Sequence, residues 1–199
     1  MVKKYLTEFI GTFFLVLTIG LSGHPLAIGG IYMVMVYMGG HVSGGHYNPS
    51  VSLAVWMRGK LPLIDLAPYM LFQIAGATAA AAIVAPFKVD PFVVEPRAGV
   101  LIYNALLAET LFSFALSLVV LNVATSKATE GNSYFGLAIG FTLLVGVSSV
   151  GGISGGAFNP AVGLGPNLIL GNLGHVWIYI VGPFLGAAIA AIVFRVQET

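Results

Sequence analysis

The sequence predicts an all-α membrane protein in which six transmembrane helices and two re-entrant half-helices form an inverted repeat. Three observations lead to this prediction. Hydrophobic residues make up 58% of the 199 residues and charged residues only 8%, whereas a soluble domain carries about 25% charged residues. The apolar residues fall into six long runs, and one short motif occurs twice, once in each half of the chain.

Charge and cysteine content exclude several classes of function. The chain has 8 Lys and Arg against 7 Asp and Glu, and no basic run, so we expect no nucleic-acid partner. Cysteine is absent, which excludes disulfides, thiolate nucleophiles and cysteine-ligated metals. His41 and His46 lie close in sequence, but two imidazoles without a third ligand make a poor metal site. We expect neither a metal nor a cofactor.

Six apolar runs are long enough to cross a bilayer, which takes about 20 residues in a helix. The first run follows Lys3 and Lys4, yet it is not a cleaved signal peptide, because no small-residue cleavage site follows it and further spans do. The predicted spans are residues 5–21, 26–42, 64–85, 100–123, 134–150 and 175–194.

Lysine and arginine are unevenly distributed between the two ends of these spans. With six crossings, Lys88 and Arg97 fall on one side of the membrane. The other six fall on the opposite side: Lys3, Lys4, Arg58, Lys60, Lys127 and Arg195. Because positively charged loops stay in the cytoplasm, we expect a multi-pass protein of the cell membrane with both termini cytoplasmic.

An internal repeat dominates the sequence. Residues 43–51 (SGGHYNPSV) align with residues 154–162 (SGGAFNPAV), with Asn48 on Asn159, and six of the nine positions are identical. The repeat extends outward to Glu8 and Glu109, which lie inside the first and fourth spans. We therefore expect a single domain over residues 1–199, with halves at 1–86 and 100–199 joined by a loop at 87–99. Each half holds three spans, an odd number, so the second half enters the membrane inverted.

Each Asn-Pro pair predicts the start of a helix, because Asn is a favoured N-cap and Pro a favoured first helical residue. The helices that follow, 49–57 and 160–169, hold about ten residues each and are about 15 Å long at 1.5 Å per residue. Neither crosses a bilayer alone, but two placed end to end span about 30 Å. The preceding glycine-rich segments would then line a wet cavity with backbone carbonyls, from Gly44, Gly45, Gly155 and Gly156.

The strings GHVSGGHYNPSV and SGGAFNPAV, with TEFIGTFFLVL near the start, closely resemble the aquaporin (major intrinsic protein) family over nearly the whole chain. The resemblance implies a passive channel for water and small neutral solutes, and a homotetramer in the lipid bilayer. It also implies that Glu8 and Glu109 anchor the re-entrant loops and that His46 lines or braces the cytoplasmic vestibule. The implied central constriction is formed by Asn48, Pro49, Ser50, Asn159, Pro160 and Ala161.

One position departs from the family pattern. The family usually places an arginine three residues after the second Asn, and this chain has Val162 there. Counting the other filter positions from the two motifs gives Ile28, Val147 and Gly156, so the predicted selectivity filter is apolar and carries no charge. Selectivity depends on pore diameter, lining donors and electrostatic barriers. We expect a pore wider than a strict water filter; the opposite expectation is a hydrophobic gate that closes between Ile28 and Val162.

Three other classes of function stay open at this point. A closed-pore structural or junction protein would keep the repeat without conducting. An alternating-access transporter also uses inverted repeats and broken helices, but here only Glu8 and Glu109 are midplane candidates for ion coupling. A rhomboid-type intramembrane protease is suggested by the string 152–155 (GISG), but Ser154 has a duplicate in Ser43 and the sixth span offers no interior histidine as a base. We expect no enzyme.

Overall fold

The computed structural model describes residues 2–87 and 92–198, which form a bundle of α-helices without a strand. The long helices are α1 (Val2–Ser22), α2 (Pro25–Ser43), α4 (Leu63–Val84), α5 (Ile102–Thr125), α6 (Phe135–Ser154) and α8 (Val176–Gln197). Two short helices, α3 (Pro49–Met57) and α7 (Pro160–Leu170), lie between them. Single 3₁₀ turns, η1 (Ala85–Phe87) and η2 (Lys127–Thr129), follow α4 and α5. Six helices are long and apolar enough to cross a membrane, as the sequence predicted.

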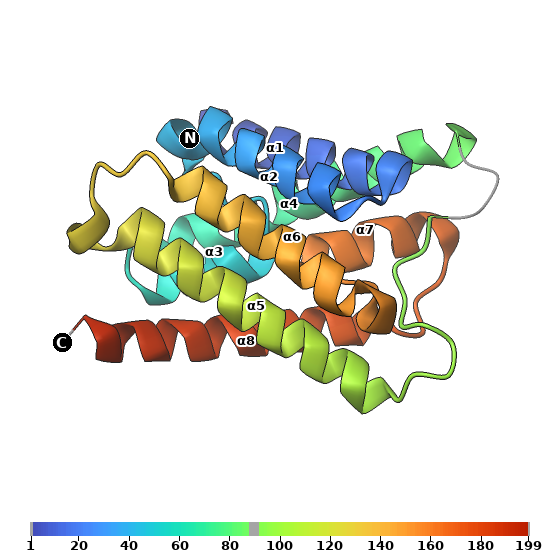
Figure 1. Ribbon diagram of the computed structural model, residues 1–199. Helices are drawn as coiled ribbons and strands as arrows, with labels where there is room; N and C mark the ends of the chain where they lie inside the picture. Colours follow the sequence, from blue (N-terminus) through green and yellow to red (C-terminus); the bar gives the residue numbers. More distant parts are fainter. Residues whose placement is uncertain (1, 88–91, 199) are drawn as a thin grey trace.

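The two half-helices approach each other from opposite ends of the bundle. In Figure 1, α3 lies between the middle of the bundle and the end that carries both termini, and α7 lies between the middle and the other end. The start of α3 at Pro49 and the start of α7 at Pro160 agree with the prediction from the two Asn-Pro pairs. We call the end with the termini the inner end and the opposite end the outer end.

The helix before the second half-helix is longer than the glycine-rich sequence suggested. The predicted span 134–150 stops four residues before α6 ends at Ser154, whereas α2 ends at Ser43, one residue past the predicted span 26–42. Within a membrane every backbone N–H and C=O needs a partner, which favours continued helix even through paired glycines. The irregular segments are therefore short, at 44–48 and 155–159.

A left-handed glycine ends each of these two helices. Gly44 has φ 93° and Gly155 has φ 92°, and each donates its N–H to a carbonyl four residues earlier. A residue with a side chain rarely adopts this conformation, so glycine is the natural C-cap. The near-identical angles show that the two halves share one local backbone geometry.

Close helix crossings occur within each half and between the two halves. At Gly76 in α4 and Gly186 in α8, an added Cβ would press on the carbonyl oxygens of Phe9 and Thr110, respectively. These glycines occupy matching places in the repeat, and they let the backbones of α1 and α4, and of α5 and α8, come into direct contact. Between the halves, a Cβ on Gly29 would lie 2.6 Å from the carbonyl oxygen of Gly140, so α2 and α6 cross equally closely.

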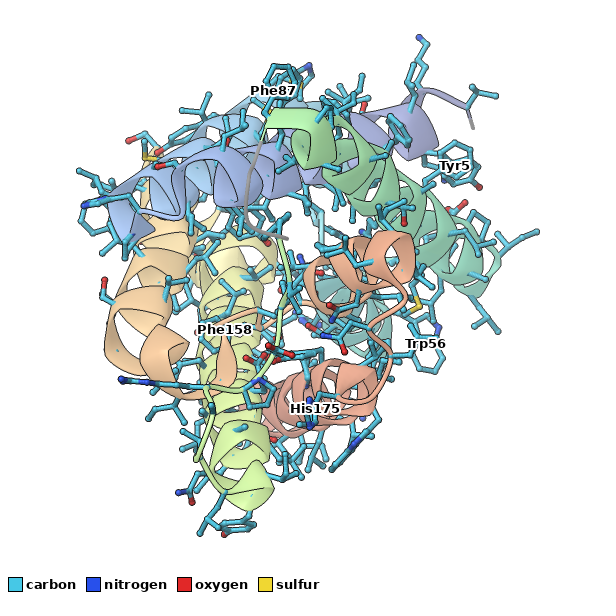
Figure 2. All side chains as sticks on the ribbon, turned by 90° about the vertical axis from the view of Figure 1, so that its right-hand side faces the viewer. Tyr5, Trp56, Phe87, Phe158 and His175 are labelled. Atoms are coloured by element: carbon cyan, nitrogen blue, oxygen red, sulfur yellow. The ribbon has the colours of Figure 1, made fainter. Side chains whose placement is uncertain are left out.

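The inner end carries the charged contacts. Lys4 pairs with Asp65, and Arg58 at the end of α3 pairs with Glu198. At the outer end, residues 92–98 run as extended chain over α6 and α7 toward α5 (Figure 1). Of the two basic residues predicted on this side, Arg97 lies here and Lys88 is outside the described residues. Figure 2 looks onto the outer end: Phe158 lies inside the bundle, whereas Tyr5 and Phe87 lie on its rim.

Candidate pore

Asn48 and Asn159 meet in the middle of the bundle at the facing ends of the two half-helices. Each side-chain oxygen caps its own helix: Asn48 Oδ1 accepts from the N–H of Ser50 and Asn159 Oδ1 from that of Ala161, both at 2.9 Å. Each side-chain nitrogen donates across the repeat boundary, Asn48 Nδ2 to the carbonyl of Phe158 and Asn159 Nδ2 to that of Tyr47, again at 2.9 Å. The two halves are thus tied together reciprocally at the centre.

This pairing leaves one N–H on each carboxamide available. An amide NH₂ has two donors, and one of them is used in the cross-boundary bond. Both asparagines line the same cavity, so the remaining donors are placed to meet a solute oxygen. The other residues of the predicted central constriction are buried and lie outside the lining of both cavities described below: Pro49, Ser50, Pro160 and Ala161.

The re-entrant segments contain two strained residues. Tyr47 has φ 50° and Phe158 has φ 47°, a left-handed conformation that bulky residues rarely adopt. Such strain persists only where the surroundings hold the backbone in place. Here the buried carboxylates of Glu8 and Glu109 provide that constraint, because each accepts the backbone N–H of the strained residue at 2.6 Å.

The carboxylates accept further donors in matching ways. Glu8 binds the N–H of His46 at 3.0 Å and the hydroxyl of Ser43 at 2.6 Å. Glu109 binds the N–H of Ala157 at 3.0 Å and the hydroxyl of Ser154 at 2.7 Å. Both carboxylates are completely buried. A buried carboxylate is costly unless it is partnered, and these two are partnered by the loops they hold.

Ser154 therefore has a structural partner. Its hydroxyl donates to Glu109 and accepts the N–H of Gly156 at 3.1 Å. Ser43 makes the same pair of contacts with Glu8 and Gly45 in the first half. A serine nucleophile needs a base within hydrogen-bond reach, whereas the hydroxyl of Ser154 is directed to a carboxylate that binds the loop.

A cavity of about 540 Å³ opens from the outer end and reaches both asparagines. All four predicted filter residues line it, and among them Ile28 and Val162 are 4% and 3% exposed. The cavity lining is Leu15, Ile19, Gly20, Gly23, Pro25, Ile28, Tyr32, Asn48, Phe92, Val93, Val94, Leu116, Leu143, Val147, Gly151, Gly155, Gly156, Ala157, Asn159 and Val162. No charged side chain occurs among these lining residues.

One wall of this outer cavity was not anticipated from the sequence. Residues 92–94 line it, and the buried Asn167 of α7 fixes them: Asn167 Nδ2 donates to the carbonyl of Val94 at 2.8 Å, and its Oδ1 accepts from the N–H of Val94 at 3.4 Å. The only sequence signal was a break in the repeat, since Trp56 occupies the matching position in the first half. The polar loop 87–99 is therefore part of the outer cavity over these residues.

A second cavity of about 920 Å³ opens from the inner end. Gly44, Gly45 and His46 line its deep part, and Lys4, Lys60 and Lys127 line its mouth. The His46 ring is buried, with Nδ1 3.0 Å from the hydroxyl oxygen of Ser52. His46 therefore lies at the inner cavity, on the side of the bundle that carries both termini.

The two cavities have no lining residue in common. Helices α1, α2, α5 and α6 contribute to both, and on the last three the facing contributions lie one turn apart: Tyr32 and Val36 on α2, Leu116 and Val120 on α5, Leu143 and Ile139 on α6. All six side chains are at most 5% exposed. The side chains between the two cavities are therefore buried and, apart from the hydroxyl of Tyr32, apolar. Within the described chain, no group of three or more His, Asp or Glu could hold a metal ion.

Comparisons with known proteins agree with this architecture. The family model described as "Major intrinsic protein" matches residues 18–194. The chain is 38% identical to "Aquaporin NIP1-3" of Oryza sativa subsp. japonica over 206 residues (95% of this chain, 71% of the relative). It is 36% identical to "Putative aquaporin NIP4-1" of Arabidopsis thaliana over 211 residues (97% and 74%). The fold is similar to the X-ray structure of the aquaglyceroporin from Plasmodium falciparum, with TM-score 0.83, 22% identity, and coverage of 97% and 95%.

Proposed function

Because the chain belongs to the major intrinsic protein family, we propose that its pore selects small neutral solutes by size. The protein is a multi-pass membrane protein and acts as a passive channel for water and small solutes, not as an enzyme. The observation that carries this proposal is the outer cavity, which reaches both asparagines without a charged side chain in its lining. The filter is assigned to Ile28, Val147, Gly156 and Val162. These four side chains include no cation that could bind an anion or a carbonyl oxygen, and no hydrogen-bond donor.

Rejection of cations is assigned to the centre of the pore. The N-terminus of a helix carries roughly half a positive charge, and α3 and α7 direct two such ends at the asparagines. A cation meets this positive field, whereas a neutral solute does not. A water molecule at this point accepts a hydrogen bond from each carboxamide, so its own hydrogens point away from the centre.

The remaining assignments concern support and assembly. Glu8 and Glu109 are the loop anchors, the carbonyls of Gly44, Gly45 and Gly155 line the pore, and His46 lines the vestibule. Residues 1–199 form one channel domain, with halves 1–86 and 100–199 joined at 87–99. The inner end, where Lys4, Lys60 and Lys127 gather, is placed in the cytoplasm because of its positive charge, with the protein in the cell membrane. We also propose a homotetramer with one pore per subunit, and family membership supports this assignment.

The test is light-scattering shrinkage of vesicles that contain the purified protein, with water, glycerol, urea and ammonia compared in one preparation. Empty vesicles give the background. We expect faster flux of water and of at least one larger neutral solute, and no conductance for sodium or potassium ions. Acceleration of water alone would contradict the wide filter.

A closed-pore structural role is the second candidate, because the two cavities share no lining residue. In that case the apolar side chains between the two cavities keep the pore closed, and the protein only organises the membrane. The same vesicles separate the two functions: purified, folded protein that accelerates no solute would favour the closed pore.

A further inference from the structure

The repeat relates every filter residue to a residue of the same type on the inner side of the asparagines. Ile28 matches Ile139, and Val147 matches Val36. Likewise, Gly156 matches Gly45, and Val162 matches Val51. This match of residue types depends on Val162, because a charged residue at that position would differ from Val51. The sequence therefore describes two apolar rings and not one.

The structure places this second set around the inner cavity. Val36, Gly45 and Ile139 all line it, and Val36 and Ile139 are 2% and 3% exposed. The local packing repeats as well: a Cβ on Gly45 would lie 3.3 Å from Val36 Cα, and one on Gly156 would lie 3.5 Å from Val147 Cα.

Helices α2 and α6 each contribute to both rings. Ile28 and Val36 lie eight residues apart on α2, as do Ile139 and Val147 on α6, which separates the rings by about 12 Å at 1.5 Å per residue. The asparagines cap α3 and α7, the two short helices that meet in the middle of the bundle (Figure 1), and so lie between the rings. A solute that crosses the pore therefore passes an apolar ring, the two carboxamides and a second apolar ring.

One position breaks the equivalence of the rings. His46 lines the inner cavity, whereas its repeat partner in the outer cavity lining is Ala157. Val162 also lines the outer cavity, whereas its repeat partner Val51 does not line the inner cavity. The inner ring therefore carries an imidazole where the outer ring carries a methyl group, and it is both bulkier and more polar on that wall.

We propose that the ring of Val36, Gly45, His46 and Ile139 is a second filter, and that this inner ring, not the outer one, limits the size of the solutes that pass. This inference rests on the proposed channel function. In a pore with two constrictions in series, the narrower one controls the flux of solutes near the size limit. The imidazole also offers its Nε2 to a neutral polar solute, because Nδ1 is paired with Ser52.

The repeat supplies matched variants for the test, which measures the ratio of glycerol to water permeability in vesicles. His46→Ala makes the inner ring like the outer one. We expect this substitution to raise the ratio of glycerol to water permeability about tenfold. This is the lower end of the discrimination that a size-selective site achieves for a difference of a few carbon atoms. Val36→Ala should raise the ratio as well, and by more than its repeat partner Val147→Ala does. The second half of the chain closes the same loop with Ala157, so His46→Ala is expected to fold.

Each outcome has a distinct meaning. An equal or larger effect of Val147→Ala than of Val36→Ala, or an unchanged ratio in His46→Ala, would overturn the inner filter. Native protein that accelerates no solute would instead refute the proposed function, before any variant is compared. If Val36→Ala does not fold, the comparison is made with Ile139→Ala and its repeat partner Ile28→Ala.

Discussion

Replacement of Glu109 by glutamine tests the loop anchor directly. The carboxylate accepts the N–H groups of Ala157 and Phe158 on different oxygens, at 3.0 and 2.6 Å. In glutamine one oxygen becomes an NH₂ group, so one of these backbone donors faces another donor in a completely buried site. The loss combines a hydrogen bond to a charged group with an unsatisfied buried N–H, together about 3 kcal/mol.

The assay is thermal unfolding of the purified protein in detergent. For a chain of this length, about 3 kcal/mol lowers the midpoint by about 6–12 °C. Glu95→Gln is the matched control: its carboxylate is exposed and accepts from Asn172 at 3.0 Å, so the same change should shift stability by less than about 0.5 kcal/mol. A midpoint of Glu109→Gln that equals that of Glu95→Gln would refute the anchor role.

Four further predictions follow from the structure. Val162→Arg adds a long cation to the outer ring and should lower glycerol flux about tenfold relative to water; an unchanged ratio in the vesicle assay would show that the outer filter is misplaced. Gly186→Ala should destabilise the protein by about 1–3 kcal/mol through overpacking, whereas Gly30→Ala, with open space around it, should not; equal midpoints would contradict the close crossing. Asn167→Leu removes the bonds to Val94 and should lower the unfolding midpoint by about 3–6 °C, from a loss of about 1.5 kcal/mol. Mercuric chloride should leave water flux unchanged, because the chain has no cysteine; inhibition at low dose would contradict this.

The repeat made the architecture predictable from the sequence. Asn48 and Asn159 marked the half-helices because an N-cap followed by Pro has a specific geometric meaning. The proposed filter positions Ile28 and Val147 were counted from these motifs, and both residues line the outer cavity. The six spans were identified because lipid demands long apolar helices.

Features that depend on tertiary context were missed. The continuation of α6 through Gly151 and Gly152 to Ser154 was not expected, because a glycine pair weakens a helix in water but not where the membrane forbids open backbone. Asn167 gave no local signal, since a single asparagine in a short helix usually faces solvent or a cap. Its partner Val94 lies 73 residues away, and sequence reasoning alone does not pair such residues.

The reciprocal bonds at the centre of the bundle also set an order of events during biosynthesis. The acceptor of Asn48 Nδ2 is the carbonyl of Phe158, 110 residues later in the chain. A ribosome adds roughly 5–20 residues per second, so the first half is complete roughly 5–20 s before its partner exists. During that interval the carboxamide of Asn48 has no final acceptor. The Asn48 carboxamide therefore gains its final acceptor only after Phe158, in the last third of the polypeptide, has been synthesised.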